Sequence, residues 1–325
     1  MRVLVTGAHG FVGGHLCALL RQAGHSVVEA VRKRDPAAAP GGEVVETGAI
    51  ERFDGWAPLL RGVDAVVHLA ARVHVMSESE ADPEQAFRNV NTLATERLAG
   101  AAATAGVRRF VYSSSVKVNG EATGSKPFDA LDAPAPVDAY GRSKLAAEQA
   151  IARVASSGAI EFTVVRPPLV YGPGVGGNVL RLMRWIERGV PLPLACVRNA
   201  RSLVSVWTLC DLLARCLDAP RAANRTLMVA DGTDLSTPEL VRHLARGIGR
   251  PARLFPAPPA LLRVAGALAG RSAEVDRLIG SLQVDTSATR ELLDWVAPID
   301  AATALERTGR WFASRTADPA NRVSG

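Results

Sequence analysis

The chain opens with a short apolar run, MRVLVT, that leads directly into the glycine-rich segment GAHGFVGG. A buried strand, a glycine loop and a helix in this order predict a dinucleotide-binding turn. Gly7 permits the tight turn, Gly10 lets a pyrophosphate approach the backbone, and Gly13 lets the helix pack on the strand. We also expect Phe11 and Val12, at the helix N-terminus, to lie at the cofactor phosphates.

The first half of the chain continues as an alternation of apolar strands and amphipathic helices. Strands are expected over residues 25–32, 62–71, 108–115 and 162–172, and helices over residues 11–24, 91–106 and 139–157. Strands separated by helices of this length form parallel sheets that are covered on both faces. The predicted fold class is therefore α/β, a Rossmann-like doubly wound parallel sheet.

The rhythm changes after Gly172, where glycine, proline and arginine become frequent and helices follow one another with little strand between them. Such a second part is expected to pack against the carboxyl ends of the strands, where ligands of these sheets bind. We therefore predict a dinucleotide-binding domain over residues 1–175 and about 204–233, and a smaller, mostly helical substrate lobe over residues 176–203 and 234–325.

Composition and charge exclude several classes of protein. The net charge of +6 is mild, and the arginines are dispersed rather than gathered in a basic stripe with aromatic residues, so no nucleic-acid partner is expected. The four cysteines form no CxxC pair and the six histidines no metal-spaced cluster, so we expect reduced thiols and no metal.

Two further features indicate a cytoplasmic protein. The N-terminus goes straight into a strand, without the pattern of a signal peptide. The most apolar late stretch, PALLRVAGALAG, is short and contains Arg263, so it predicts an amphipathic helix rather than a membrane span.

A tyrosine and a lysine four positions apart, Tyr140 and Lys144, are the strongest catalytic candidates. The chain holds only three tyrosines and four lysines among its 325 residues, so chance would give roughly 0.04 such pairs. Asp138 can cap the predicted helix that begins here, and a spacing of four places both side chains on one face. An ammonium beside a phenol lowers the pKa of the phenol, which suits a proton transfer to or from a sugar or alcohol oxygen.

A serine run at the end of a neighbouring predicted strand supplies a third partner. Ser113, Ser114 and Ser115 follow the apolar residues FVY. A hydroxyl at this place can share a hydrogen bond with the reacting oxygen and the tyrosine, which steadies developing charge. The spacing alone does not choose among the three.

The end of the second predicted strand bears on the cofactor. NAD-binding sheets usually place an acidic residue here, on the ribose hydroxyls. This chain has Val31, followed by Arg32 and two further basic residues. A basic group suits the extra 2′-phosphate of NADP, so NADP(H) is favoured over NAD(H); the alternative is that these are exposed loop charges.

The motifs TGxxGxxG, HLAA, SSS, YxxxK and RPPLVYGPG, in this order, resemble the extended short-chain dehydrogenase/reductase family, and specifically its nucleotide-sugar epimerases, dehydratases and reductases. The resemblance makes Tyr140 the acid/base, Lys144 the ribose-binding residue and Ser115 the acting serine. It also implies that Asn91 supports the active site and that Pro167 lies by the nicotinamide. Further cofactor-binding positions that it implies are Ile50, Leu69, Ala70 and Ala71. An aspartate frequent in the family near the adenine is replaced here by Ala49.

More closely, the segments SSSVKVNGE, RSLVSV and GSLQVD resemble a branch found in surface-polysaccharide pathways. This branch includes 4-ketoreductases that act on UDP-4-keto-6-deoxy-N-acetylhexosamines. The resemblance implies that Ser115 and Lys117 contact the sugar nucleotide. It also implies that Asn178 and Arg201 hold the diphosphate of the sugar nucleotide. A homodimer is expected as well.

Three functions remain open from the sequence. The altered cofactor loop favours a 4-ketoreductase that exchanges its cofactor in each turnover. The nearest alternative is a 4-epimerase of UDP-glucose or UDP-N-acetylglucosamine. A more remote one is a non-catalytic NADP-sensing regulator, which would not need the acid/base residues.

Overall fold

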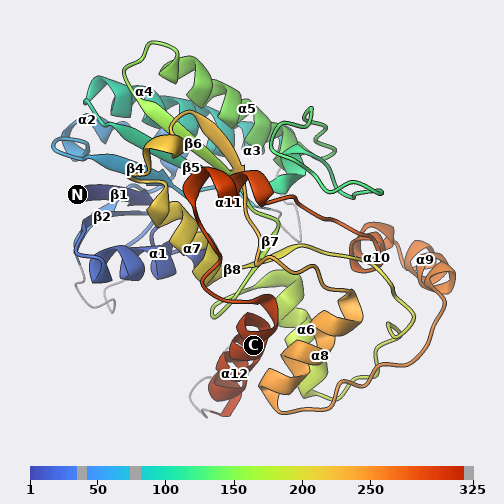
Figure 1. Cartoon of the computed structure of the whole chain (residues 1–325). Coiled ribbons are helices and arrows are strands. Elements are labelled where there is room, and N and C mark those ends of the chain that lie inside the picture. Colours follow the sequence, from blue (N-terminus) through green and yellow to red (C-terminus); the bar gives the residue numbers. More distant parts are fainter. Residues whose placement is uncertain (35–41, 74–81, 318–325) are drawn as a thin grey trace.

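A seven-stranded parallel sheet forms the centre of the N-terminal part of the protein, in a computed structural model that describes residues 1–34, 42–73 and 82–317 (Figure 1). The strand order is β3-β2-β1-β4-β5-β6-β9. The chain adds β2 and β3 on one side of β1 and then crosses over to add the remaining strands on the other side, so the switch point lies between β1 and β4. The strands are β1 (Arg2–Thr6), β2 (Ser26–Val31), β3 (Glu43–Glu46), β4 (Ala65–His68), β5 (Arg109–Ser113), β6 (Glu161–Arg166) and β9 (Arg225–Met228).

Helices cover both faces of this sheet, as the alternating sequence pattern requires. On one face α1 (Phe11–Gln22) and α7 (Val206–Arg215) pack on side chains such as Val3 and Val5. On the other face α2 (Trp56–Leu59), α4 (Ala94–Thr104) and α5 (Ala139–Ala155) pack around Leu4 and its neighbours. The predicted Rossmann-like doubly wound α/β fold is confirmed.

A second group of elements holds a separate core. The short strands β7 (Leu169–Tyr171) and β8 (Leu203–Ser205) pair with each other, and α6 (Gly177–Glu187), α8 (Thr237–Ile248) and α12 (Ala301–Ala317) pack beside them. Helices α9 (Pro259–Leu268) and α10 (Ser272–Ile279) lie at the far end of this lobe, while α11 (Ser287–Leu293) contacts β9 (Figure 1). The short turns are η1 (Ile50–Arg52), α3 (Pro83–Phe87), η2 (Arg88–Leu93), η3 (Val116–Val118) and η4 (Pro220–Ala222).

Two predicted elements differ in the structure. The single strand expected over residues 162–172 is two strands in different sheets, because Pro167 and Pro168 interrupt the run after β6. Proline has no N–H to donate to a sheet ladder. The helix expected over residues 91–106 is an α-helix only from Ala94. Its first expected residues, including Asn91, belong to a π-helical turn, Arg88–Leu93.

The division into two domains stays a prediction, and its last residues, 318–325, lie outside the described residues. No helix in the part of the chain that the structure describes is long and apolar enough to cross a membrane. Within the same ranges no three His, Cys, Asp or Glu side chains are grouped so that they could hold a metal ion. The cytoplasmic location and the homodimer also remain predictions.

Candidate active site

The glycine loop has the geometry of a close backbone approach. Gly7 has a φ of +68°, and a Cβ there would lie 2.9 Å from the backbone nitrogen of Ala70. A Cβ on Gly13 would lie 2.1 Å from the Gly7 carbonyl oxygen, so only glycine lets α1 pack this closely on the loop. Gly10 is the N-cap of α1 and offers no side-chain cap to the first turn. The N–H groups of that turn, which includes Phe11 and Val12, are therefore available to a pyrophosphate, and the loop fits a dinucleotide.

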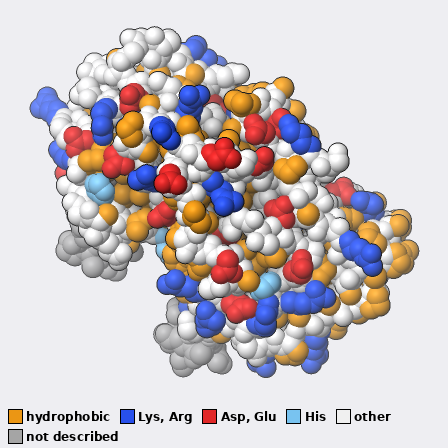
Figure 2. Space-filling model, viewed as in Figure 1, with side chains coloured by type: hydrophobic (Ala, Val, Ile, Leu, Met, Phe, Trp, Pro, Cys, Tyr) orange, Lys and Arg blue, Asp and Glu red, His pale blue; other side chains and the backbone are white. Residues whose placement is uncertain are grey.

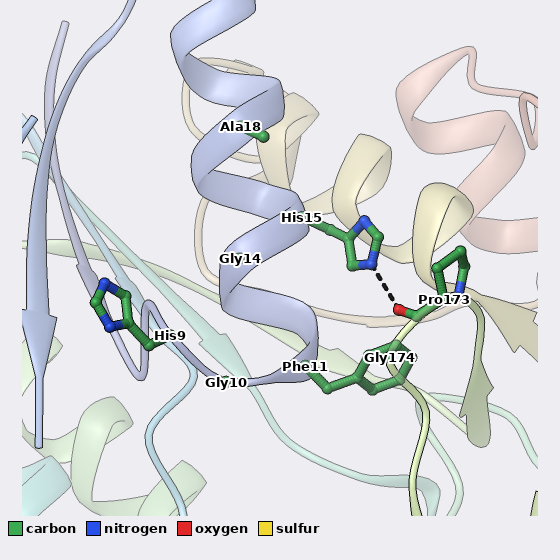
Figure 3. A pocket seen from close by; sticks show the side chains of 8 residues that line it. All are labelled: His9, Gly10, Phe11, Gly14, His15, Ala18, Pro173 and Gly174. Carbon is green, nitrogen blue, oxygen red and sulfur yellow. Dashed lines mark hydrogen bonds between the residues drawn. The ribbon is translucent and has the colours of Figure 1, made fainter. Parts of the chain in front are cut away.

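The outer side of the same loop forms an open groove. Its lining is drawn in Figure 3: His9, Gly10, Phe11, Gly14, His15, Ala18, Pro173 and Gly174. His15 Nε2 lies 2.8 Å from the carbonyl oxygen of Pro173, which ties α1 to the segment after β7. Helix α1, which begins at the glycine loop, is thus held by the segment after β7 as well as by the sheet.

The end of β2 carries no carboxylate at the predicted ribose position. Val31 is buried, and Arg32, directly after the strand, is exposed. The acidic residue of this strand, Glu29, lies two positions earlier and is occupied by an ion pair with Arg21. Ile50, after β3, is buried at the start of η1.

The carboxyl ends of β1, β4, β5 and β6 bring most of the predicted site residues to one edge of the sheet. The hydroxyl of Thr6 accepts hydrogen bonds from the backbone N–H groups of Leu69 and Ala70, both at 3.2 Å, which fixes the HLAA turn against the glycine loop. Ala71 follows in the same turn. At the next pair of strand ends, the N–H of Val116 donates to the carbonyl oxygen of Pro167 at 3.0 Å.

Tyr140 is the second residue of α5, and its side chain hydrogen-bonds with that of Ser115. The Asp138 side chain caps this helix by accepting from the N–H of Gly141 at 2.7 Å, as the sequence predicted. Burial raises the pKa of Tyr140 to about 12, and its interaction with the Ser115 hydroxyl opposes that rise. Ser115 is 9% exposed and caps η3, where its hydroxyl accepts from the N–H of Lys117 at 3.2 Å. Among the three serines, Ser115 is therefore the one in contact with the tyrosine.

Lys144 lies one turn along α5 and is 2% exposed. Its ammonium donates to the carbonyl oxygen of Ser113 at 2.8 Å and stands 4.6 Å from the centre of the Tyr112 ring. Burial lowers the pKa of Lys144 to about 7, against the opposite pull of Glu148. The lysine was expected to lower the pKa of Tyr140, but burial dominates and raises it, because the ammonium stands 5.9 Å from the centre of the phenol ring.

Asn91 braces the site from the π-helical turn and is 1% exposed. Its side-chain amide bonds both backbone groups of Arg72, at 2.8 Å and 3.0 Å, and donates to the Ser143 hydroxyl at 2.9 Å. Asn91 therefore joins the loop after β4 to α5 at the turn that carries Tyr140 and Lys144. A π-helical turn of this kind is frequently found at functional sites.

Lys117, predicted to bind the substrate, is engaged by two carboxylates. Its ammonium lies 2.6 Å from Glu121 and 2.5 Å from Asp138. The backbone of Lys117 also packs on α5, since a Cβ on Gly141 would lie 2.7 Å from the Lys117 carbonyl oxygen. These contacts connect Lys117 to the first turn of the helix that bears Tyr140.

A buried ionic cluster beneath the site was not found from the sequence. Arg166, at the end of β6, forms a bidentate pair with Glu148, with contacts of 3.0 Å and 2.6 Å. The Ser114 hydroxyl donates to the same carboxylate, and Arg166 donates to Asn119 at 3.0 Å. Glu148 lies one helical turn after Lys144, so a spacing of four from the lysine was the available signal.

The predicted diphosphate-binding residues lie in the second group of elements. Asn178, in the first turn of α6, is exposed and accepts from Arg181 at 3.1 Å. One terminal nitrogen of Arg201 donates to the carbonyl oxygens of Arg277 and Gly280, at 2.6 Å and 3.1 Å. Burial lowers the pKa of Arg201 from its ordinary value. These bonds fix the direction of the guanidinium at the end of α10.

The sequence matches a known protein family over more than half of its length. The sequence pattern of the NAD dependent epimerase/dehydratase family matches residues 3–230, from β1 to the end of the large sheet. The chain belongs to the NAD dependent epimerase/dehydratase family. It is thus an enzyme of the short-chain dehydrogenase/reductase type, in the nucleotide-sugar branch.

Relatives in the family span nearly the whole chain. A protein of Vibrio cholerae named UDP-glucose 4-epimerase is 41% identical over 95% of each chain. A protein of Escherichia coli O157:H7 named N-acetyl-alpha-D-glucosaminyl-diphospho-ditrans,octacis-undecaprenol 4-epimerase is 24% identical and covers 94% of this chain and 93% of its own. The solved structure of MoeE5 in complex with UDP-glucuronic acid and NAD is 26% identical, with a TM-score of 0.76 over 98% of this chain and 100% of its own.

Proposed function

We propose that the protein is an NAD-dependent 4-epimerase of a UDP-linked hexose or N-acetylhexosamine. The observation that carries the proposal is the contact between Tyr140 and Ser115. Tyr140 shares one face of α5 with Lys144, and all three residues lie at the carboxyl ends of the strands beside the glycine loop. The 41% identity to a UDP-glucose 4-epimerase over 95% of both chains supports the choice of reaction. A role in surface-polysaccharide synthesis fits such an activity.

In the proposed reaction, the positive charge of a bound oxidised nicotinamide would favour the phenolate of Tyr140 against the burial that raises its pKa. This phenolate would take the proton of the sugar C4 hydroxyl as the C4–H bond breaks. The bound nicotinamide supplies the chemistry of accepting that hydride and returning it. Ser115 donates a hydrogen bond to the C4 oxygen and steadies its developing charge. The 4-keto sugar would then turn its opposite face to the nicotinamide. The returned hydride would form the new C4–H bond on that face, and Tyr140 would give the proton back to the C4 oxygen, which yields the epimer.

The same chain offers residues to hold both ends of the reactants. Lys144 is proposed to hold the nicotinamide ribose, with Asn91 as the positioning residue that fixes the turn before it. The N–H groups of the first turn of α1 are proposed to bind the cofactor pyrophosphate. Asn178 and Arg201 are proposed to hold the sugar-nucleotide diphosphate. One nitrogen of the Arg201 guanidinium is held by backbone carbonyl oxygens, which leaves its other N–H donors for a phosphate.

One observation favours a second candidate, a 4-ketoreductase that uses NADP(H) on a UDP-4-keto-6-deoxy-N-acetylhexosamine. The ribose end of the site has buried Val31 and exposed Arg32 where a ribose-binding carboxylate is usual. A positive charge at this place suits a 2′-phosphate and a cofactor that exchanges in each turnover. In that reaction NADPH would supply the hydride that adds to C4, and Tyr140 would supply the proton of the new hydroxyl.

A labelled substrate separates the two candidates. The purified protein is incubated with UDP-N-acetylglucosamine or UDP-glucose that carries deuterium at C4, without added cofactor. A 4-epimerase gives the C4 epimer with the deuterium retained. A ketoreductase gives no epimer, but consumes NADPH when a UDP-4-keto-6-deoxy sugar is supplied. If neither substrate class reacts, the proposed function is wrong.

A further inference from the structure

His68, the last residue of β4, is a buried titratable side chain that the proposed reaction does not use. Figure 2 shows histidine side chains at the surface, but His68 is 0% exposed and is not among them. Both of its ring nitrogens are engaged: Nδ1 lies 2.6 Å from the Thr6 hydroxyl, and Nε2 lies 2.9 Å from the Thr95 hydroxyl. The imidazole therefore joins the end of β1 to the first turn of α4.

The partners of His68 fix which of its ring nitrogens carries the proton. The Thr95 hydroxyl donates to the carbonyl oxygen of Asn91 at 2.7 Å, and a carbonyl oxygen can only accept. Because the single hydroxyl proton of Thr95 is used in this bond, Nε2 of His68 must donate to Thr95. Burial, with a further contribution from Lys144, lowers the pKa of His68 to about 3, so the ring is neutral and its Nδ1 accepts from Thr6.

These contacts belong to one continuous hydrogen-bond chain between the two halves of the candidate active site. At one end the Thr6 hydroxyl accepts from two N–H groups of the HLAA turn, both at 3.2 Å. At the other end the Asn91 side chain donates to the Ser143 hydroxyl at 2.9 Å, which donates to the backbone carbonyl oxygen of Tyr140 at 2.7 Å. Five buried side chains form the hydrogen-bond chain, none more than 6% exposed: Thr6, His68, Thr95, Asn91 and Ser143.

The surroundings of the imidazole also require a neutral ring. His68 stacks on Tyr112, with ring centroids 5.7 Å apart and planes inclined by 20°. The Lys144 ammonium stands 4.6 Å from the centre of the same Tyr112 ring. A protonated His68 would add a second positive charge beside this ammonium. It would also turn Nδ1 from an acceptor into a donor, which would break the hydrogen-bond chain at Thr6.

We propose that His68 is a positioning residue that holds the HLAA turn and helix α5 in a fixed relative position through this hydrogen-bond chain. The inference rests on the proposed function, in which the HLAA turn lies at the cofactor and α5 carries the acid/base Tyr140. One neutral tautomer fits only one arrangement of donors and acceptors, so a change at Thr6 should reach Tyr140 at the other end. A small displacement of an acid/base is enough to slow a reaction.

Variants that remove one hydroxyl at a time test the proposal with the full-length protein. Thr6→Val and Thr95→Val each delete one member of the hydrogen-bond chain and keep a β-branched side chain. The matched control is Thr163→Val, near the start of β6. Thr163 is also 0% exposed, and its hydroxyl donates to one carbonyl oxygen, that of Ala222, at 2.8 Å.

Two NMR measurements need no turnover. Nitrogen-15 spectra should show His68 of the wild type with its proton on Nε2, without titration from about pH 5 to about pH 9. The protein has only three tyrosines, so carbon-13 at the tyrosine Cζ gives three signals. We expect Thr6→Val and Thr95→Val both to move the Tyr140 signal, and Thr163→Val to leave it in place.

Turnover gives a third measurement. With the UDP-sugar that the wild type epimerises, kcat should fall about tenfold in Thr6→Val and in Thr95→Val, with unchanged affinity for UDP. The double variant should fall no further, because both substitutions break the same hydrogen-bond chain. Thr163→Val should keep the wild-type kcat, although it also loses a buried hydrogen bond.

Several results would overturn the proposal. One is a His68 ring that carries its proton on Nδ1 or titrates in this pH range. Another is a Tyr140 signal that stays in place in Thr6→Val, or that moves equally in Thr163→Val. Losses of kcat that add in the double variant would also contradict it. If the NMR results hold while the wild type epimerises no UDP-sugar, the positioning by His68 is supported and the proposed function is wrong.

Discussion

Replacing Lys144 by methionine should change how stability depends on pH. Burial lowers the pKa of the Lys144 ammonium from 10.5 to about 7. At about 1.4 kcal/mol for each pH unit, this difference makes the charged lysine cost about 5 kcal/mol in the folded state. Methionine has similar length and no charge, so the variant loses this term and keeps most of the packing.

The sign follows from proton binding. The folded pKa is depressed, so between about pH 7 and pH 10.5 the unfolded chain binds more protons at this site, and wild-type stability rises with pH. The cost is fully present below about pH 7 and is gone above about pH 10.5. From pH 6 to pH 9 the wild type should therefore gain about 3 kcal/mol relative to Lys144→Met.

Urea unfolding of both proteins at several pH values measures this difference. Taking the difference between the two proteins removes the other titrating groups, and the bond from Lys144 to the Ser113 carbonyl contributes a constant offset. A free-energy difference that stays constant from pH 6 to pH 9 would refute the reasoning. It would mean that the lysine is not desolvated in the folded protein.

Three further predictions test the supporting structure. Gly13→Ala should weaken NAD binding and lower the melting temperature because its Cβ would meet the Gly7 carbonyl at 2.1 Å, whereas Gly14→Ala, with its nearest contact at 3.9 Å, should do neither; calorimetry measures both effects. Glu148→Gln should lower the free energy of unfolding in urea by about 3–5 kcal/mol, because the buried charge of Arg166 would lose its counter-charge. Glu84→Gln, in an exposed pair, should lower it by under about 1 kcal/mol. Lys117→Met should lower kcat with KM unchanged, because Lys117 contacts Asp138, the cap of the helix that bears Tyr140. A raised KM with unchanged kcat would instead indicate that Lys117 binds the substrate.

The order of elements could be predicted because its signals are local. Each strand of the sheet, and each helix that covers it, is specified by a run of fewer than 20 residues. The glycine loop specifies the first turn between a strand and a helix. The break at Pro167 and Pro168 was also local, but the prediction joined β6 and β7 because both flanking runs are apolar. A periodic pattern shows that a segment is buried in a sheet, and not which sheet it joins.

The environment of the site could not be predicted, because it depends on distant residues. Arg166 and Glu148 are 18 positions apart, and Lys117 pairs with Asp138 across 21 positions. The rise in the pKa of Tyr140 has the same origin, since burial is produced by the whole fold. Helix α9 is a further case: the sequence predicted an amphipathic helix there, but not that Leu261, Val264 and Leu268 would remain exposed.

The most direct test of the proposed function compares the wild type with Tyr140→Phe, both loaded with NAD. Each is mixed with UDP-glucose and, separately, with UDP-N-acetylglucosamine, and the epimer is measured by proton NMR. We expect the wild type to form the C4 epimer of at least one of them, and the variant to form it slower by about 10²–10⁴-fold with unchanged affinity for UDP. Epimer formation by the variant at the wild-type rate would contradict the assignment of Tyr140 as the acid/base.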